Sequence, residues 1–179
     1  MKILTTFVSK SGKEYTVIEP KIELLDEVLD FVNDLVAEDT FLSFTGRPIE
    51  IKDEKIWLEN VLKEIGEKKQ ELIWVTDGEK IVGSCDVRRG GTRDYHVGTV
   101  GIMVRKDYRN DGIGRFMFEY ILDRSQKMNL EIVRLHIFDN NELAKKIYEK
   151  YGFREFSRLP NGFYRKGKFS DALQMYKNI

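Results

Sequence analysis

Hydrophobic residues recur along this chain with two different periods. Between residues 21 and 38 they follow the three- and four-residue spacing of one helical face, and a second helix is expected at about 53–69. Short apolar runs at 2–10 and 15–19 predict two strands joined by a turn at Ser11-Gly12. Each pattern extends over enough residues to predict a regular element. The first third of the chain is therefore expected to contain both helices and strands.

A hairpin is expected next, because strand-like runs at 72–76 and 80–88 flank Asp77-Gly78, a pair that favours a two-residue turn. Later in the chain, Asp139 and Glu142 have the spacing of a helix capping box. Helices and strands therefore intermix throughout, which is typical of a mixed α/β fold. The remaining expected elements are strands at about 95–104, 131–138 and 172–177, helices at about 115–128 and 139–151, and a loop at 158–166.

Length and charge limit the organisation of the protein and its partners. The 179 residues show no change of composition, no linker and no internal repeat, so we expect a single domain over 1–179. Lysine plus arginine and aspartate plus glutamate both number 30, which gives a formal net charge of +0. No overall field then attracts nucleic acid or an anionic membrane, and we expect neither as a partner.

Apolar runs and cysteine content narrow the protein class further. No run approaches the roughly 20 apolar residues of a membrane span, and no signal peptide is visible. A cytoplasmic location is therefore the expectation. The one cysteine, Cys85, excludes an internal disulfide framework and a cysteine metal cluster. It lies in an apolar run, so we expect a buried small side chain rather than a nucleophile.

The most informative stretch runs from Ile102 to Arg115, where an apolar strand ends in a polar turn and the turn opens a helix. At a helix start the first main-chain N–H groups have no partner inside the helix, and the macrodipole is positive. Gly112 and Gly114 carry no Cβ, so a bulky anion can approach the main chain closely. The stretch indicates a pyrophosphate cradle. The alternative is that the two glycines serve only the turn and close helix packing.

Two common nucleotide-binding loops do not fit the spacing of this stretch. A dinucleotide-binding fingerprint needs a third small residue three places after Gly114, where this chain has Met117. A P-loop needs Gly-Lys followed by Ser or Thr, whereas Gly114 is followed by Arg115 and Phe116. The candidate cradle is therefore of another kind.

A second motif follows about 30 residues downstream and includes Asn141, Ala144, Tyr148 and Gly152-Phe153. Asn141 and Tyr148 are seven residues apart, so both project from one helical face, roughly 10 Å from each other. This spacing lets an amide and a phenol contact one extended ligand. The alternatives are structural, because Asn141 can cap the helix, Tyr148 can be core, and Gly152 is a typical C-terminal cap.

Together the two motifs resemble the GCN5-related N-acetyltransferases. Their acetyl-CoA loop has the pattern Arg/Gln-x-x-Gly-x-Gly/Ala, matched here from Arg109 to Gly114, and the later strand–helix pair carries Asn-x-x-Ala-x-x-x-Tyr-x-x-x-Gly-Phe. The tail resembles the closing segment of the ribosomal-protein and diamine acetyltransferase-like branch, at Gly167, Phe169, Asp171 and Met175. The resemblance covers roughly residues 95–175, while 1–91 fits only in the order of its elements.

This resemblance implies an α/β fold with a central mixed, mostly antiparallel sheet of about six to seven strands and about four flanking helices. The strand at 95–104 would part from the strand at 132–138 and leave a V-shaped slot for acetyl-CoA. No metal is implied, and no His, Asp or Glu cluster has metal-ligand spacing. The implied acetyl-CoA contacts are Ile102, Met103, Val104, Arg109, Asn110, Asp111, Gly112, Ile113, Gly114, Arg115, Asn141 and Tyr148.

The implied reaction is acetyl transfer from acetyl-CoA to a primary amine, with Tyr148 as the general acid for the leaving thiolate. His136 is a candidate general base, since an ordinary pKa of about 6.5 suits that task. The alternatives are that His136 is structural and that His96, Asp86 or water takes the proton. The acceptor can be a protein N-terminus, an amino acid or a small amine, and a homodimer is possible. Aromatic side chains are expected to border the acceptor, namely Phe41, Phe44, Phe163 and Tyr164.

A different class of function also remains open. The same slot could serve a non-catalytic module that binds CoA, or a nucleotide through the Arg109–Arg115 loop alone, for regulation. Consumption of acetyl-CoA with an amine distinguishes the enzyme from that module.

Overall fold

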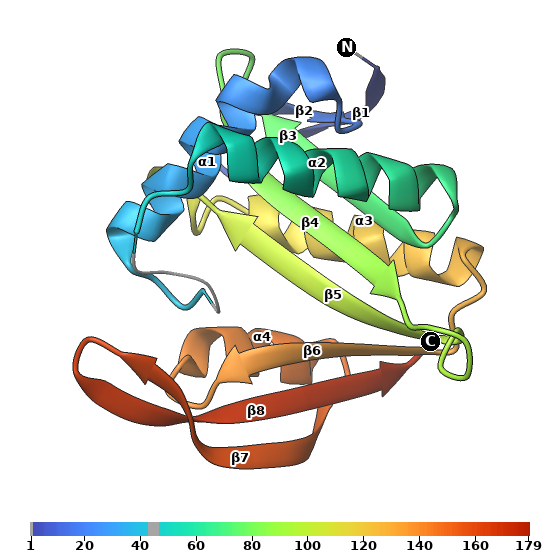
Figure 1. The fold of residues 1–179 in the computed structure, drawn as a ribbon, viewed down its shortest axis with the longest axis vertical. Coiled ribbons are helices and arrows are strands. Elements are labelled where there is room, and N and C mark those ends of the chain that lie inside the picture. Colours follow the sequence, from blue (N-terminus) through green and yellow to red (C-terminus); the bar gives the residue numbers. More distant parts are fainter. Residues whose placement is uncertain (1, 43–46) are drawn as a thin grey trace.

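The computed structural model describes residues 2–42 and 47–179. Figure 1 shows its helices and strands, which intermix along the chain as the hydrophobic pattern predicts. In chain order the elements are β1 (Ile3–Val8), β2 (Glu14–Ile18), α1 (Leu25–Glu38), α2 (Ile51–Gly66), β3 (Gln70–Thr76), β4 (Ile81–Arg89), β5 (Val97–Val104), α3 (Ile113–Lys127), β6 (Ile132–Phe138), α4 (Glu142–Lys150), β7 (Arg154–Arg165) and β8 (Lys168–Asn178), with short 3-10 helices at Ile22–Leu24 and Lys106–Tyr108.

Eight strands form one sheet within the described residues, in the order β1-β2-β3-β4-β5-β6-β8-β7. All neighbouring strands are antiparallel except β5 and β6, which run parallel. The β5–β6 pairing covers only three residue pairs, from Val97↔Ile132 to Thr99↔Arg134. Beyond Thr99 and Arg134 the two strands part, and Figure 1 shows them diverging from that end. The expected splayed, mostly antiparallel sheet is therefore confirmed.

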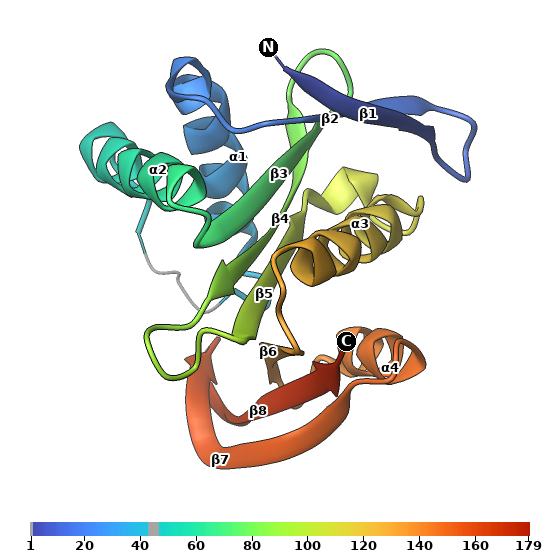
Figure 2. The same cartoon turned by 90° about the vertical axis from the view of Figure 1, so that its right-hand side faces the viewer.

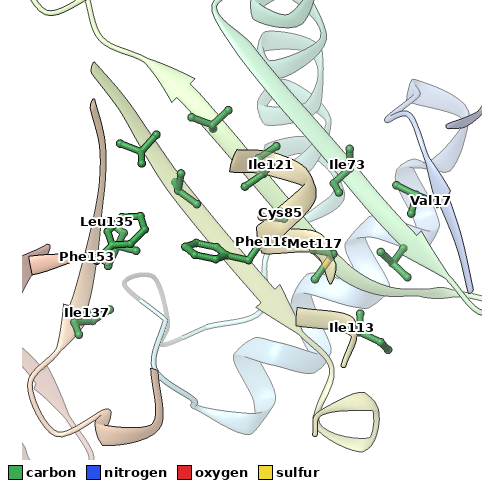
Figure 3. Close-up of a cluster of buried hydrophobic side chains, with 14 of the residues drawn as sticks. Val17, Ile73, Cys85, Ile113, Met117, Phe118, Ile121, Leu135, Ile137 and Phe153 are labelled. Atoms are coloured by element: carbon green, nitrogen blue, oxygen red, sulfur yellow. The ribbon is translucent and has the colours of Figure 1, made fainter. Parts of the chain in front are cut away.

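Helices cover both faces of the sheet and create two separate cores. α1 and α2 lie on one face and α3 on the other, as Figure 2 shows. The α1/α2 face buries Phe31, Leu58 and Trp74. The α3 face buries a larger cluster that includes Met117 and Ile121, and Figure 3 shows Cys85 within it. The prediction that Cys85 is a buried small side chain is confirmed.

The parted strands are held together on the α3 face by aromatic packing. In Figure 3, Phe118 extends from α3 toward Leu135 of β6 and toward Phe153. The ring centroids of Phe118 and Phe153 lie 5.6 Å apart. Because apolar contacts replace the missing main-chain hydrogen bonds, β6 can separate from β5 without unfolding.

The last third of the chain differs from its predicted elements. Residues 158–166 are not a loop, since β7 continues to Arg165 and pairs with β8. The register shifts between Leu159 and Phe163, where Pro160 and Asn161 (φ 54°) form an irregularity inside the strand. These residues have turn chemistry, and here they produce a bulge in a long hairpin. This hairpin raises the number of strands from the expected six or seven to eight in the described residues.

Two local turn predictions are also corrected. The β3–β4 connection is a four-residue loop rather than a two-residue turn, because Asp77 Oδ1 accepts hydrogen bonds from the N–H groups of Glu79 (3.1 Å) and Lys80 (3.2 Å). Asp139 does not cap α4, since its Oδ1 accepts from Asp171 N–H at 3.1 Å. α4 accordingly starts at Glu142, three residues later than predicted.

No helix in the described ranges 2–42 and 47–179 is long and apolar enough to cross a membrane.

Candidate active site

The edge of β5 that faces β6 carries unpaired main-chain groups beyond the parting point. Directly after β5, Arg105 N–H donates to Val82 O in β4 at 2.9 Å. Main-chain groups of successive residues point to alternate sides of an antiparallel strand. Val100 and Ile102 therefore direct their N–H and C=O groups toward the gap, while Met103 directs its own to β4. An extended ligand could pair with this edge as an added strand.

After β5 and the 3-10 helix at Lys106–Tyr108 comes a turn that opens α3. The main-chain N–H groups from Asn110 to Arg115 have no hydrogen-bond acceptor among the described residues. Gly112 is the N-cap of α3 with φ 96°, a conformation that only glycine adopts without strain. Gly114 lies inside the helix, and a Cβ there would be 3.6 Å from Val104 Cγ2. A helix start with free N–H groups is able to hold an anion, and the pyrophosphate cradle at this turn stays a prediction.

The side chains of the turn anchor it to distant segments. The Arg109 guanidinium donates to Val104 O at 2.9 Å and forms a bidentate ion pair with Glu38 at the end of α1. The Asp111 carboxylate accepts from Ser11 N–H (2.7 Å) and the Ser11 hydroxyl (2.8 Å). Hydrogen bonds from the Ser9 and Ser11 hydroxyls lower the pKa of Asp111. The charge of Asp111 is therefore directed to the β1–β2 turn.

Lys10 in that same turn is a neighbour of the candidate cradle. Its N–H donates to Asp111 O at 3.0 Å. Its side chain passes Gly112, with Cγ 3.6 Å from the position of a Cβ. This lysine brings a positive charge to the turn.

Tyr148 reaches the α3 face of the parted strands from α4. Its ring centroid lies 5.2 Å from that of Phe118. Burial raises the pKa of the Tyr148 phenol, and the nearby Cys85 adds to the rise. The phenol is therefore protonated at neutral pH, as a proton donor must be. Asn141 accepts a hydrogen bond from Ala144 N–H at 3.3 Å, so it caps α4.

On the opposite face, polar side chains gather where β5 and β6 part. Asp86 pairs with Gly101, and Thr99 pairs with Arg134, so these side chains share one face. His136, two residues along β6, points to that face too. Partial burial, with the charge of Arg134, lowers the pKa of His136. Its imidazole is consequently neutral at neutral pH and able to accept a proton.

The aromatic residues expected near the acceptor divide into two groups. Phe163 stacks on Phe138 with centroids 4.0 Å apart, and Phe41 contacts Phe138 edge-on at 5.5 Å. The Arg165 guanidinium lies 4.2 Å from the Phe41 ring centroid. Tyr164 projects from the other side of β7 and packs against Phe169. Phe41 and Phe163 are therefore brought together, whereas Tyr164 is not.

Phe44, also expected near the acceptor, lies outside the described residues. His96 directly precedes β5 and accepts through its carbonyl from Glu131 N–H at 2.8 Å. No group of three or more His, Cys, Asp or Glu side chains in the described residues is placed to hold a metal ion.

Several residues that shape the site were not singled out from the sequence. Arg134 and Phe138 share the strand alternation of His136, so their common face was a usable signal. Glu38 and Ser11 contact the turn from 71 and 100 residues away along the chain, and no local pattern predicts such contacts.

Comparison with known proteins agrees with this geometry. Residues 69–155 match a family model described as an acetyltransferase (GNAT) domain. The chain is 31% identical over 103 residues to a Drosophila melanogaster protein named probable N-acetyltransferase san, covering 55% of this chain and 54% of that protein. It is 28% identical over 123 residues to the L-amino acid N-acetyltransferase AaaT of Escherichia coli K12, covering 67% of this chain and 74% of AaaT. It thus spans about half the length of the fly relative.

A solved structure supplies the fold comparison. RimL, a ribosomal L7/L12 alpha-N-protein acetyltransferase solved in complex with coenzyme A, superimposes with a TM-score of 0.80. The match covers 99% of this chain and 98% of RimL at 8% sequence identity, so it compares the fold alone.

Proposed function

Because the chain belongs to the GCN5-related N-acetyltransferase (GNAT) superfamily, we propose that it transfers an acetyl group from acetyl-CoA to the nitrogen of a primary amine. The observation that carries this proposal is the parting of β5 from β6, close to a turn whose N–H groups have no acceptor among the described residues. When bound, acetyl-CoA would supply the acetyl group as a reactive thioester. Relatives named as N-acetyltransferases, and the coenzyme A bound to RimL, support the choice of cosubstrate.

The residues present fit such a ligand. The C=O of Ile102 and the N–H of Val104, which strand alternation places on the gap side of β5, would pair with the amide-bearing arm. The N–H groups from Asn110 to Arg115 would hold the pyrophosphate at the positive end of α3. Lys10 would add a positive charge on the side of Gly112. These contacts use the turn in the conformation that Glu38 and Ser11 already stabilise.

Three groups would then perform the chemistry. The N–H of Ile102 would stabilise negative charge on the thioester oxygen during attack. His136 would accept a proton from the amine, and Tyr148 would donate one to the departing sulfur. These two side chains lie on opposite faces of the parted strands. The proton of the amine would therefore leave on one face of the sheet, and the thiolate would receive its proton from the other face.

Initial-rate measurements of thiol release from acetyl-CoA, with and without a mixture of amines, test this function. Calorimetry with CoA should accompany them. We expect CoA binding and thiol release that depends on both substrates. Binding without any amine-dependent release would instead support the non-catalytic module, and absence of CoA binding would overturn both.

A further inference from the structure

A cavity of about 740 Å³ opens on the α2 face of the sheet, at the point where β5 and β6 part. Its size is that of a small-molecule site. Asp86, Gly101, Thr99 and Arg134 line it, and their pairing places all four on one face. Four further charged residues line the cavity, namely Glu64, Lys69, Arg88 and Arg89.

The positive side chains around the cavity differ in how many of their nitrogens already form hydrogen bonds or ion pairs. Arg88 pairs with Glu64 at 2.6 Å, and Lys69 pairs with Glu67 at 2.6 Å. Arg89 donates to the main-chain oxygens of Tyr95 and Met128. Arg134 is different, because among the described residues only its Nε is engaged, with Thr99 Oγ1 at 3.1 Å. Its two terminal nitrogens are free to hold an anion.

The negative side chains show the same contrast. Glu64 already forms an ion pair with Arg88. In the part of the chain that the structure describes, only Oδ2 of Asp86 is engaged, accepting from Gln70 Nε2 at 3.0 Å. Its Oδ1 projects over Gly101 and would lie 2.6 Å from a Cβ at that residue. One carboxylate oxygen therefore faces the cavity and is free to hold a cation.

We infer that this cavity binds the acyl acceptor, and that the acceptor is a free amino acid whose ammonium contacts Asp86 and whose carboxylate contacts Arg134. The inference rests on the proposed acetyl transfer and names its substrate class. Thr99, which holds the Arg134 guanidinium, is a diagonal cross-strand neighbour of Asp86, about 7–8 Å away. The Asp86 carboxylate and the Arg134 guanidinium are therefore neighbours on one face, where a small ligand carrying both charges can contact both.

The cavity also lies where the amine must react. Asp86 faces Gly101, whose neighbour Ile102 directs its N–H into the gap. The absence of a Cβ at Gly101 leaves room for the Asp86 carboxylate, which lies over this residue. An ammonium on Asp86 would thus wait beside the thioester. A peptide N-terminus lacks the adjacent carboxylate and would leave Arg134 unused.

Protonation of Asp86 should weaken acceptor binding. Burial raises its pKa to about 6, against the opposing effects of Gln70 on β3 and Arg88 on β4. The other charged residues that line the cavity are Glu64 on α2, Lys69 directly before β3, Arg89 on β4 and Arg134 on β6. Above pH 6 the carboxylate is charged and holds the ammonium, and below pH 6 the KM for the acceptor should rise.

Matched acceptors test the substrate class. Wild-type protein is assayed with L-amino acids, with the amines that remain after their decarboxylation, and with short peptides carrying the same N-terminal residue. We expect kcat/KM to be at least about tenfold higher for the free amino acids, since a charge-assisted hydrogen bond is lost without the carboxylate. Equal use of the decarboxylated amines, or preference for the peptides, would overturn the inference.

Matched variants test the two residues. These variants are assayed well above the pKa of Asp86, where that carboxylate stays charged without Arg88. Arg134→Gln should then raise the KM for amino acids about tenfold and leave the KM for decarboxylated amines unchanged, whereas Arg88→Gln removes a charge already paired with Glu64 and should change neither. Asp86→Asn should raise the KM for both acceptor types, with Glu64→Gln as its control. If Arg134→Gln and Arg88→Gln behave alike while thermal melting is unchanged, Arg134 does not bind the acceptor.

A binding measurement separates this inference from the proposed function. Calorimetry with an L-amino acid in the presence of CoA reports acceptor binding without turnover. Binding that is weakened by Arg134→Gln but not by Arg88→Gln supports the inference even if no acetyl transfer occurs. Thiol release with amines but no measurable preference for amino acids supports the proposed function and refutes the inference.

Discussion

Replacing Gly114 by aspartate should separate the stability of the protein from its affinity for CoA. A Cβ at this residue would make only ordinary contact, 3.6 Å from Val104 Cγ2, so the side chain fits. A negative charge in the first turn of a helix interacts favourably with the macrodipole, by about 0.3–1 kcal/mol. Loss of glycine from a helix is favourable as well. The free energy of unfolding should therefore stay the same or rise.

The same carboxylate should oppose CoA binding. At about 5 Å from a phosphate, and with an effective dielectric constant between about 20 and 80, the repulsion is about 1–3 kcal/mol. This corresponds to a roughly 5- to 150-fold loss of affinity. Calorimetry with CoA measures it, and thermal melting measures stability on the same samples. Gly114→Ala, which adds the Cβ without the charge, is the control and should lose less.

Wild-type affinity in Gly114→Asp, with stability preserved, would show that phosphate does not lie at this turn. Gly112→Ala provides a contrast, because its φ of 96° penalises any side chain. That variant should lose about 1–2 kcal/mol of stability. Gly112 would then be needed for the backbone conformation, and Gly114 for ligand binding.

Three further variants test individual side chains. Tyr148→Phe should leave CoA affinity unchanged and lower kcat about 10- to 1000-fold if the phenol is the general acid; unaffected turnover would assign that proton to water. Since the pKa of His136 is lowered, kcat should rise with pH through a value below the ordinary ~6.5. His136→Gln should abolish this limb of the profile, and an unchanged limb would make His136 structural. In Gly101→Ala the new Cβ would lie 2.6 Å from Asp86 Oδ1 and displace it, so the acceptor KM should rise about tenfold while the CoA dissociation constant stays constant.

Much of the fold was predictable from the sequence, because the hydrophobic spacing that defines each helix lies within a short stretch of residues. The apolar spacing of residues 21–38 predicts α1, and that of the Ile113–Lys127 segment predicts α3, since each helix buries one face. The β7–β8 hairpin was missed for the same reason. Pro160 and Asn161 have turn propensities, but pairing with β8 overrides them and absorbs the extra residues as a bulge.

The candidate site was only partly predictable. The turn from Arg109 to Gly114 and the phenol of Tyr148 have a spacing that identifies them in the sequence. The role of Asp86 depends on its pairing with Gly101 and on its contact with Gln70, which is a property of the folded sheet. The expected assignment of His136 as base stays a prediction, and the cavity that we assign to the acceptor is lined by Asp86 instead.

Transfer of a labelled acetyl group tests the central claim most directly. The protein is incubated with acetyl-CoA carrying carbon-13 in its acetyl group and with a mixture of L-amino acids, and the products are identified by mass spectrometry. The account predicts label attached to amine nitrogen, in amounts that depend on the protein and that fall in Tyr148→Phe. Label found only in intact acetyl-CoA or in free acetate, while CoA binds, would contradict it.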